Sequence, residues 1–169
     1  ASTTKLMTAY LAFKYGNMDD IVTVSDSVSS FASDEVVCNL QPGDTVTLYD
    51  LLCGLLLRSG NDCGVAIAEH ISGSVEAFAE LMNSEAKALG ATGSHFVNPH
   101  GLHNENHYTT AYDLYLIFNE AIKYDSFNEI IHMTSYQTAY YDKDGKAKEL
   151  TVNNTNRLLR GDFQAPENI

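Results

Sequence analysis

Apolar residues recur at helical spacing in segment after segment of this 169-residue chain, and this repetition limits the fold more than any other feature. The first such segment carries Leu6, Tyr10 and Phe13 on one helical face. We expect that helix to begin near Ser2, with Ser2 or Thr3 as the N-cap, and to end at Gly16-Asn17. The same spacing predicts about six helices in all, among them residues 48–58, 62–71, 75–89 and 109–121.

The runs that favour β-structure are short, and none is long enough to form the centre of a large sheet. Residues 21–24 and 45–47 are two short strands that we expect to pair. Residues 133–141 and 147–152 flank a turn-forming run, which predicts a hairpin. The resulting fold class is mainly α with small β ribbons. A long Gly- and His-rich loop is predicted over 91–107, and loops of this length are usually functional.

Charge excludes two classes of partner. Lys and Arg number 10 against 22 Asp and Glu, which gives a net charge of −12. A chain this acidic lacks the basic surface that binds nucleic acid or an anionic membrane. The longest strongly apolar run, residues 51–57, is far shorter than the roughly 20 residues that a membrane-spanning helix needs.

The three cysteines, Cys38, Cys53 and Cys63, are too few and too far apart for a disulfide scaffold or a zinc ribbon. We expect them to be small buried side chains. A pairing of Cys53 with Cys63 is the less favoured alternative.

Ser2 and Lys5 form an S-x-x-K pattern at the start of the first helix. Residues three apart lie on one helical face, so the lysine amine can reach the serine hydroxyl. A buried lysine can lose its charge and accept the serine proton, which makes the hydroxyl a nucleophile. The alternative is an ordinary N-cap serine followed by a surface lysine.

Ser59 and Asn61 flank a glycine at the break between two apolar helices. Both side chains can point into one cleft from such a junction. The alternative is a helix–turn–helix connection that uses Ser, Gly and Asn only as turn residues.

Together the two motifs resemble the serine β-lactamase/DD-peptidase superfamily, and most of all its low-molecular-mass D-alanyl-D-alanine carboxypeptidases. The resemblance covers almost the whole chain in the same order: ASTTKLMTA (1–9), LQPGDTVT (40–47), LLLRSGND (55–62), HFVNPHGL (95–102), the run from His107 to Leu114, and NTNRLL (154–159).

The resemblance implies an acyl-enzyme mechanism. Ser2 would attack the peptide bond between two terminal D-alanines, and Lys5 would take its proton. Ser59 would help to pass this proton to the departing amine, and Asn61 would hold Lys5 and the substrate amide. The expected partners are a peptidoglycan stem peptide ending in D-Ala-D-Ala and β-lactam antibiotics as inhibitors. No cofactor and no metal are implied, and the family is exported to the outer face of the bacterial cell membrane.

The chain departs from the family at one point, because no lysine is followed by the Thr-Gly of the K-T-G motif. In the family that motif lies on a strand beside the cleft. We therefore interpret residues 1–169 as one incomplete peptidase domain, the helical part that lacks most of a five-stranded sheet. We expect the isolated chain to be inactive and to expose an apolar face, which the missing sheet or another copy would cover.

The alternative function is a non-catalytic relative that binds peptidoglycan or penicillin without turnover.

Three smaller signals have a functional and a structural interpretation. His95, His100, His103 and His107 could hold zinc, but no ligand-spaced motif supports this; His100 is also a weak candidate for a substrate contact. Tyrosines on the predicted hairpin could stack on sugars, but cross-strand packing is favoured. The run that starts at Glu149 partly matches the E-x-x-L-N motif of a β-lactamase. We interpret the match as coincidence and expect Glu149 to lie in a strand.

Overall fold

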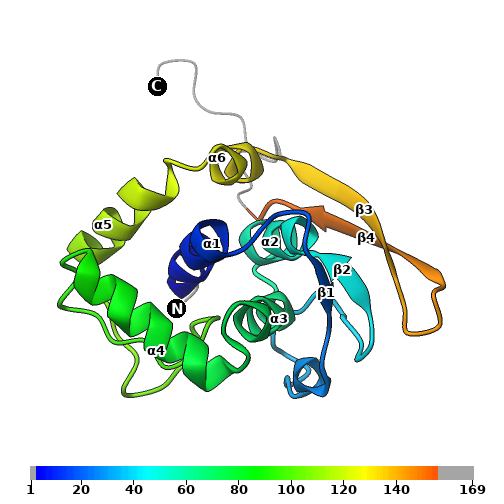
Figure 1. Ribbon diagram of the computed structural model, residues 1–169, viewed down its shortest axis with the longest axis horizontal. Coiled ribbons are helices and arrows are strands. Elements are labelled where there is room, and N and C mark those ends of the chain that lie inside the picture. The colour runs from blue at the N-terminus through cyan, green and yellow to red at the C-terminus, as the bar shows by residue number, and fades with distance from the viewer. Residues whose placement is uncertain (1–2, 156–169) are drawn as a thin grey trace.

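The first helix, α1 (Thr4–Tyr15), is buried on nearly every side, and this places it at the centre of the molecule. The computed structural model describes residues 3–155 of the chain. Because α1 carries apolar or small residues around almost its whole circumference, it can bury all faces at once. It packs against the helices α2 to α6 introduced below, and Figure 1 shows it enclosed by them.

The other predicted helices begin and end within two residues of the predicted positions, and two short helices are additions. The predicted helices are α2 (Leu48–Leu57), α3 (Asn61–Ser72), α4 (Val75–Ala88) and α5 (Ala111–Ala121), and the additions are α6 (Asp125–Ile131) and a 3₁₀ helix, η1 (Asp26–Ser29). The short α6 was not predicted. Its seven residues place only Phe127 and Ile130 in the core, which is too few for a visible period.

Hydroxyl side chains cap three of the α-helices. Thr47, Ser74 and Thr110 each accept a hydrogen bond from the backbone N–H three residues further along. In α2 the N-cap is Thr47, and Asp50 in the first turn supplies the N–H from which it accepts. Thr3 occupies the N-cap position of α1, as predicted, but makes no side-chain capping bond.

The strands form one sheet instead of two separate ribbons. They are β1 (Ile21–Thr23), β2 (Thr45–Thr47), β3 (Ser135–Tyr141) and β4 (Ala147–Asn153), antiparallel in the order β1-β2-β3-β4. A single pairing, Thr45 with Tyr141, joins the two predicted ribbons. The prediction of two ribbons was wrong because an edge strand has unpaired backbone N–H and C=O groups. These groups can pair with another strand that is distant in the sequence. In Figure 1 the sheet flanks α2, which contacts β2, β3 and β4.

A buried carboxylate links α2 to the sheet. Asp50 accepts hydrogen bonds from the hydroxyls of Tyr136, at 2.7 Å, and Thr138, at 3.2 Å. The Tyr136 ring also meets the Tyr49 ring edge to face, at 5.7 Å between centroids. Tyr136 therefore packs between sheet and helix, in line with the structural interpretation of the hairpin tyrosines. Glu149 lies in β4, as predicted, and its side chain is exposed.

The outer face of α5 carries an exposed apolar stripe. Tyr112, Tyr115, Phe118 and Ile122 follow one another at helical spacing and remain between 38% and 66% exposed. An exposed apolar face was expected from the sequence at the place of the missing sheet. That the α5 stripe is this face stays a prediction, as does what covers it. None of the helices within residues 3–155 has both the length and the apolar character needed to cross a membrane.

Candidate active site

The first turn of α1 carries Lys5 in a place that disfavours its charge. The side chain is only 6% exposed, and Nζ donates a hydrogen bond to the carbonyl of His100 at 2.7 Å. Burial lowers the pKa of Lys5 from 10.5 to about 8, because removal from water destabilises the ammonium form. A neutral amine, able to accept a proton, is thus within reach near neutral pH. Ser2 lies outside the described residues, so its contact with Lys5 stays a prediction.

The junction between α2 and α3 carries Ser59 and Asn61. Ser59 has a φ of 64°, in the left-handed region that few residues other than glycine adopt. Such strain is held in place by surrounding contacts and clusters at functional sites. Here Asn61 N–H donates to the carbonyl of Val36 at 2.8 Å, and Arg58 Nε donates to the carbonyl of Val37 at 2.8 Å. The junction is therefore fastened to the segment that precedes the sheet strand β2.

Lys5, Ser59 and Asn61 line one open cleft with a volume of about 440 Å³. Segment 34–36 forms one part of its lining and segment 100–103 another. The structure thus brings together three of the four residues predicted from the two motifs. Asp34 and Glu35 add two acidic side chains to this lining.

The segment carrying His100 is anchored directly to α1. Thr8 Oγ1 donates to the carbonyl of Pro99 at 2.6 Å, and Asn98 accepts from Gly101 N–H at 2.7 Å. His100 lines the cleft, and its ring meets Phe31 edge to face. Burial, with a smaller effect of nearby Lys5, lowers the pKa of His100 to about 4. Its ring is therefore neutral at pH 7, and its carbonyl is the group that meets Lys5.

His107 holds the start of α1, a contact that the sequence did not predict. Its Nδ1 accepts a hydrogen bond from Val97 N–H at 3.0 Å, so the ring proton must lie on Nε2. Nε2 can then donate to Thr4 Oγ1, 2.7 Å away. Burial lowers the pKa of His107, which favours this neutral form. The only local signal was the position of His107 in a long polar loop.

Asp62, the second residue of α3, fixes segment 34–40 beside the cleft. It is fully buried. Its Oδ1 accepts from the backbone N–H of Cys38 at 2.8 Å and of Cys63 at 2.9 Å, and Oδ2 accepts from Leu40 N–H at 3.0 Å. Sequence reasoning missed this role, because an acidic residue in a first helical turn is common and its distant backbone partners leave no sequence signal.

The four loop histidines do not gather into a metal site within residues 3–155. His95 pairs with Tyr108 through backbone hydrogen bonds, and His107 binds Thr4. In that range the one group of three possible metal ligands is Cys38, Asp62 and Cys63.

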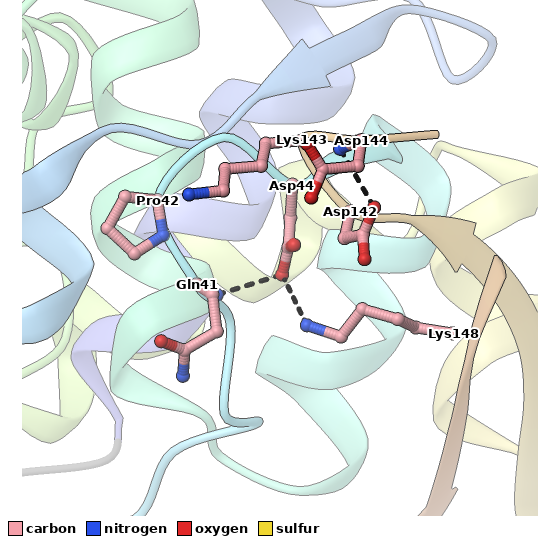
Figure 2. Close-up of a pocket in the computed structure, with 7 residues that line it drawn as sticks. All are labelled: Gln41, Pro42, Asp44, Asp142, Lys143, Asp144 and Lys148. Carbon is pink, nitrogen blue, oxygen red and sulfur yellow. Dashed lines mark hydrogen bonds and ion pairs between the residues drawn. The ribbon is translucent and has the colours of Figure 1, made fainter. Parts of the chain in front are cut away.

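A second pocket lies away from the predicted residues, between the 41–44 turn and the tip of the β3–β4 hairpin. Its volume is about 430 Å³. Figure 2 shows Asp44 between Gln41 and Lys148, with Asp142 to Asp144 on the hairpin side. Buried Asp44 accepts from Gln41 N–H at 2.8 Å and pairs with Lys148 Nζ at 2.9 Å. These bonds fasten the hairpin tip to the turn before β2, so we assign the pocket a structural role.

The helical core, with a buried lysine at the start of its central helix and a Ser-Gly-Asn junction across the cleft, is the arrangement of a DD-peptidase. The crystal structure of a Streptomyces DD-transpeptidase matches with a TM-score of 0.87 and 33% identity, over 95% of this chain and 65% of that one. An evolved penicillin-binding protein homologue from Mycobacterium tuberculosis matches with a TM-score of 0.82 and 30% identity, over 95% of this chain and 59% of that one.

The chain belongs to the D-alanyl-D-alanine carboxypeptidase family, whose profile matches residues 1–164. The carboxypeptidase DacF of Bacillus subtilis is 38% identical over 95% of this chain, and DacC of Escherichia coli is 35% identical over 94%. The chain spans about two fifths of these relatives, 41% of the first and 40% of the second.

Proposed function

We propose that the whole protein is a serine-type D-Ala-D-Ala carboxypeptidase that removes the terminal D-alanine from peptidoglycan stem peptides. Ser2 attacks the carbonyl carbon of the last peptide bond, and Lys5 accepts the hydroxyl proton. Ser59 relays this proton to the amine of the departing D-alanine. Asn61 orients Lys5 and the substrate amide, and water then hydrolyses the ester on Ser2. No cofactor or metal takes part.

The buried position of Lys5 is the observation that carries this proposal. A general base acts in its neutral form, and at pH 7 a pKa of about 8 leaves roughly one lysine in ten neutral, against fewer than about one in a thousand for an ordinary lysine. Lys5 is almost completely removed from water, and its pKa is lowered to about 8. The same residue lines the cleft together with Ser59 and Asn61. A surface lysine beside an N-cap serine would have none of these properties.

The family and the names of its relatives support the same substrate class. β-Lactams resemble the acyl-D-Ala-D-Ala end and would remain on Ser2 as slowly hydrolysed esters. Because peptidoglycan lies outside the cell membrane, we place the protein at the extracytoplasmic face of the membrane, in or next to the cell wall.

A fluorescent penicillin tests the nucleophile. We expect the whole protein to be labelled covalently and a Ser2→Ala variant to remain unlabelled. Ser27→Ala is a matched control, since Ser27 is exposed on η1 and is not among the cleft-lining residues. Equal labelling of the Ser2→Ala variant would refute the assignment.

The same samples separate the two functions that the sequence left open. A carboxypeptidase releases D-alanine from an acyl-D-Ala-D-Ala peptide, and Ser2→Ala abolishes the release. Labelling by penicillin without any release of D-alanine would instead favour the non-catalytic binding relative.

A further inference from the structure

Two of the three cysteines lie next to each other in the core, beside the cleft. Cys38 and Cys63 are both buried, and their sulfur atoms and an Asp62 carboxylate oxygen all lie within 4.8 Å of one another. Both sulfurs are free thiols in the structure. This is not the pairing that the sequence suggested, because the neighbour of Cys63 is Cys38 and not Cys53.

Two glycines leave the space that these sulfurs fill. A Cβ on Gly54 would lie 2.6 Å from Cys63 Sγ and 3.1 Å from Cys38 Sγ. A Cβ on Gly60 would lie 2.7 Å from Cys38 Sγ and 3.4 Å from Cys63 Sγ. Any larger residue at either position would collide with the sulfurs, so both thiols occupy one common, closely fitted space.

The backbones that carry the two thiols are already held together. The Asp62 carboxylate accepts one hydrogen bond from the N–H of Cys38 and another from that of Cys63. Cys38 belongs to segment 34–40, part of which lines the cleft, and Cys63 lies in the first turn of α3, two residues after Asn61. A covalent bond between the sulfurs would therefore tie this segment to the helix that carries a predicted substrate-binding residue.

We propose that Cys38 and Cys63 form a disulfide bond when the protein folds in the presence of a disulfide oxidant, and that this bond fixes segment 34–40 onto α3. One cysteine thiolate attacks the oxidant and displaces one of its two sulfurs as a thiol, which leaves a mixed disulfide. The other cysteine thiolate then displaces the second. Two S–H bonds are lost and one S–S bond is gained, while two protons and two electrons pass to the oxidant.

Burial determines when the bond can form. Contact with Cys38 and removal from water both raise the pKa of Cys63, so the native thiol is rarely ionised. Oxidation is therefore slow once the protein has folded and fast while the segment is open. A bound metal is the competing use of the same three groups. The disulfide is favoured because Asp62 already accepts three backbone N–H groups, from Cys38, Leu40 and Cys63.

The test uses the whole protein carrying Cys53→Ala, which leaves only the proposed pair within this chain. The protein is unfolded in denaturant with a reductant and refolded with glutathione disulfide, and free thiols are then alkylated under denaturing conditions. We expect a peptide pair joined through Cys38 and Cys63, lighter than the reduced peptides by two hydrogen atoms. The oxidised form should also melt about 5–10 °C higher than the reduced form.

Three variants and one exchange measurement complete the design. The protein with all three cysteines should give the same linked pair with Cys53 alkylated, and Cys38→Ala or Cys63→Ala should abolish it. The backbone amides of Cys38 and Leu40 should exchange with solvent more slowly in the oxidised protein. Alkylation of both cysteines after refolding, a bond through Cys53, or tight zinc binding with resistance to oxidation would overturn the proposal. None of these readouts depends on penicillin labelling, so the proposal and the proposed function can fail separately.

Discussion

At the scale of single residues, the buried position that lets Lys5 act as a base also lowers the stability of the folded protein. Its pKa in the folded protein is about 8, against 10.5 for an ordinary lysine. Between these two values the unfolded chain binds more protons at Lys5 than the folded chain does, so stability attributable to this group rises with pH. Below pH 8 the full cost of burying the ammonium group is present. A neutral side chain of similar length would avoid that cost.

The free energy of unfolding of a Lys5→Met variant, measured relative to that of the wild type, should therefore be highest below pH 8. We expect its relative free energy of unfolding to fall by roughly 2 kcal/mol as the pH rises from 8 to 10.5. The hydrogen bond to His100 is lost at both pH values, so the change with pH isolates the titration. Urea unfolding at the two pH values measures it.

Lys14→Met is the matched control for that experiment. Lys14 lies on the same helix, but its ion pair with Glu85 raises its pKa, so it stays charged across this window. Its relative stability should change only slightly between pH 8 and 10.5, and in the opposite direction to that of Lys5→Met, because in this window only the unfolded chain begins to release the Lys14 proton. A Lys5→Met effect that is equally flat would contradict the lowered pKa.

At the scale of elements, α2 connects the sheet to the core. Its first turn carries Asp50, which accepts the hydroxyls of Tyr136 and Thr138 from β3. Its N-cap, Thr47, is also the last residue of β2. One short stretch thus ends a strand, starts a helix and binds a second strand. Hydrogen bonds to a buried carboxylate are stronger than those between neutral groups.

Loss of the Asp50 carboxylate should therefore cost more than loss of the cap. We expect Asp50→Ala to lower the free energy of unfolding by about 2–3 kcal/mol, and Thr47→Ala by about 1 kcal/mol. Urea unfolding of both variants measures the two values.

A third variant, Tyr136→Phe, tests whether the Asp50 contact itself is responsible. Because both partners share one bond, the double variant Asp50→Ala/Tyr136→Phe should lose less than the sum of the single losses. Strict additivity would show that Asp50 acts through some other contact.

Most elements could be predicted because their signals are local. The face of α4 and its glycine stop, and the turn between β3 and β4, depend on residues a few positions apart. The joining of the ribbons through Thr45 and Tyr141 depends on distant chain segments and left no signal. The same holds at the site. Motif spacing brought Lys5, Ser59 and Asn61 together, whereas Asp62 and His107 act on partners that the sequence does not mark.

At the scale of the whole molecule, residues 3–155 provide a helical core, the cleft lined by Lys5, Ser59 and Asn61, and an exposed stripe on α5. The family resemblance implies that the Ser2 backbone N–H is one of two donors to the oxyanion. It assigns the other donor, and the group that binds the substrate carboxylate, to a K-T-G strand. No such triad occurs in this chain. The chain spans 41% of DacF, so most of that relative's length lies outside the matched region.

The isolated chain should hydrolyse D-Ala-D-Ala peptides negligibly. The loss of one oxyanion donor alone costs about 3–4 kcal/mol, roughly a 10²–10³-fold decrease in rate. The missing carboxylate contact lowers the rate further. Release of D-alanine by the isolated chain and by the whole protein, at equal concentrations, measures the difference. Turnover by the isolated chain comparable with the whole protein would show that residues 1–169 suffice.

The backbone conformation at Ser59 also limits which residues can replace serine at this position. Threonine offers the same hydroxyl, but its branched Cβ fits poorly into a left-handed conformation with a φ of 64°. Glycine and asparagine accept that conformation easily and carry no hydroxyl. Serine carries the hydroxyl and, because its Cβ is unbranched, is less strained in this conformation than threonine. A substitution of Ser59 by threonine, glycine or asparagine therefore loses either the left-handed backbone conformation or the hydroxyl group.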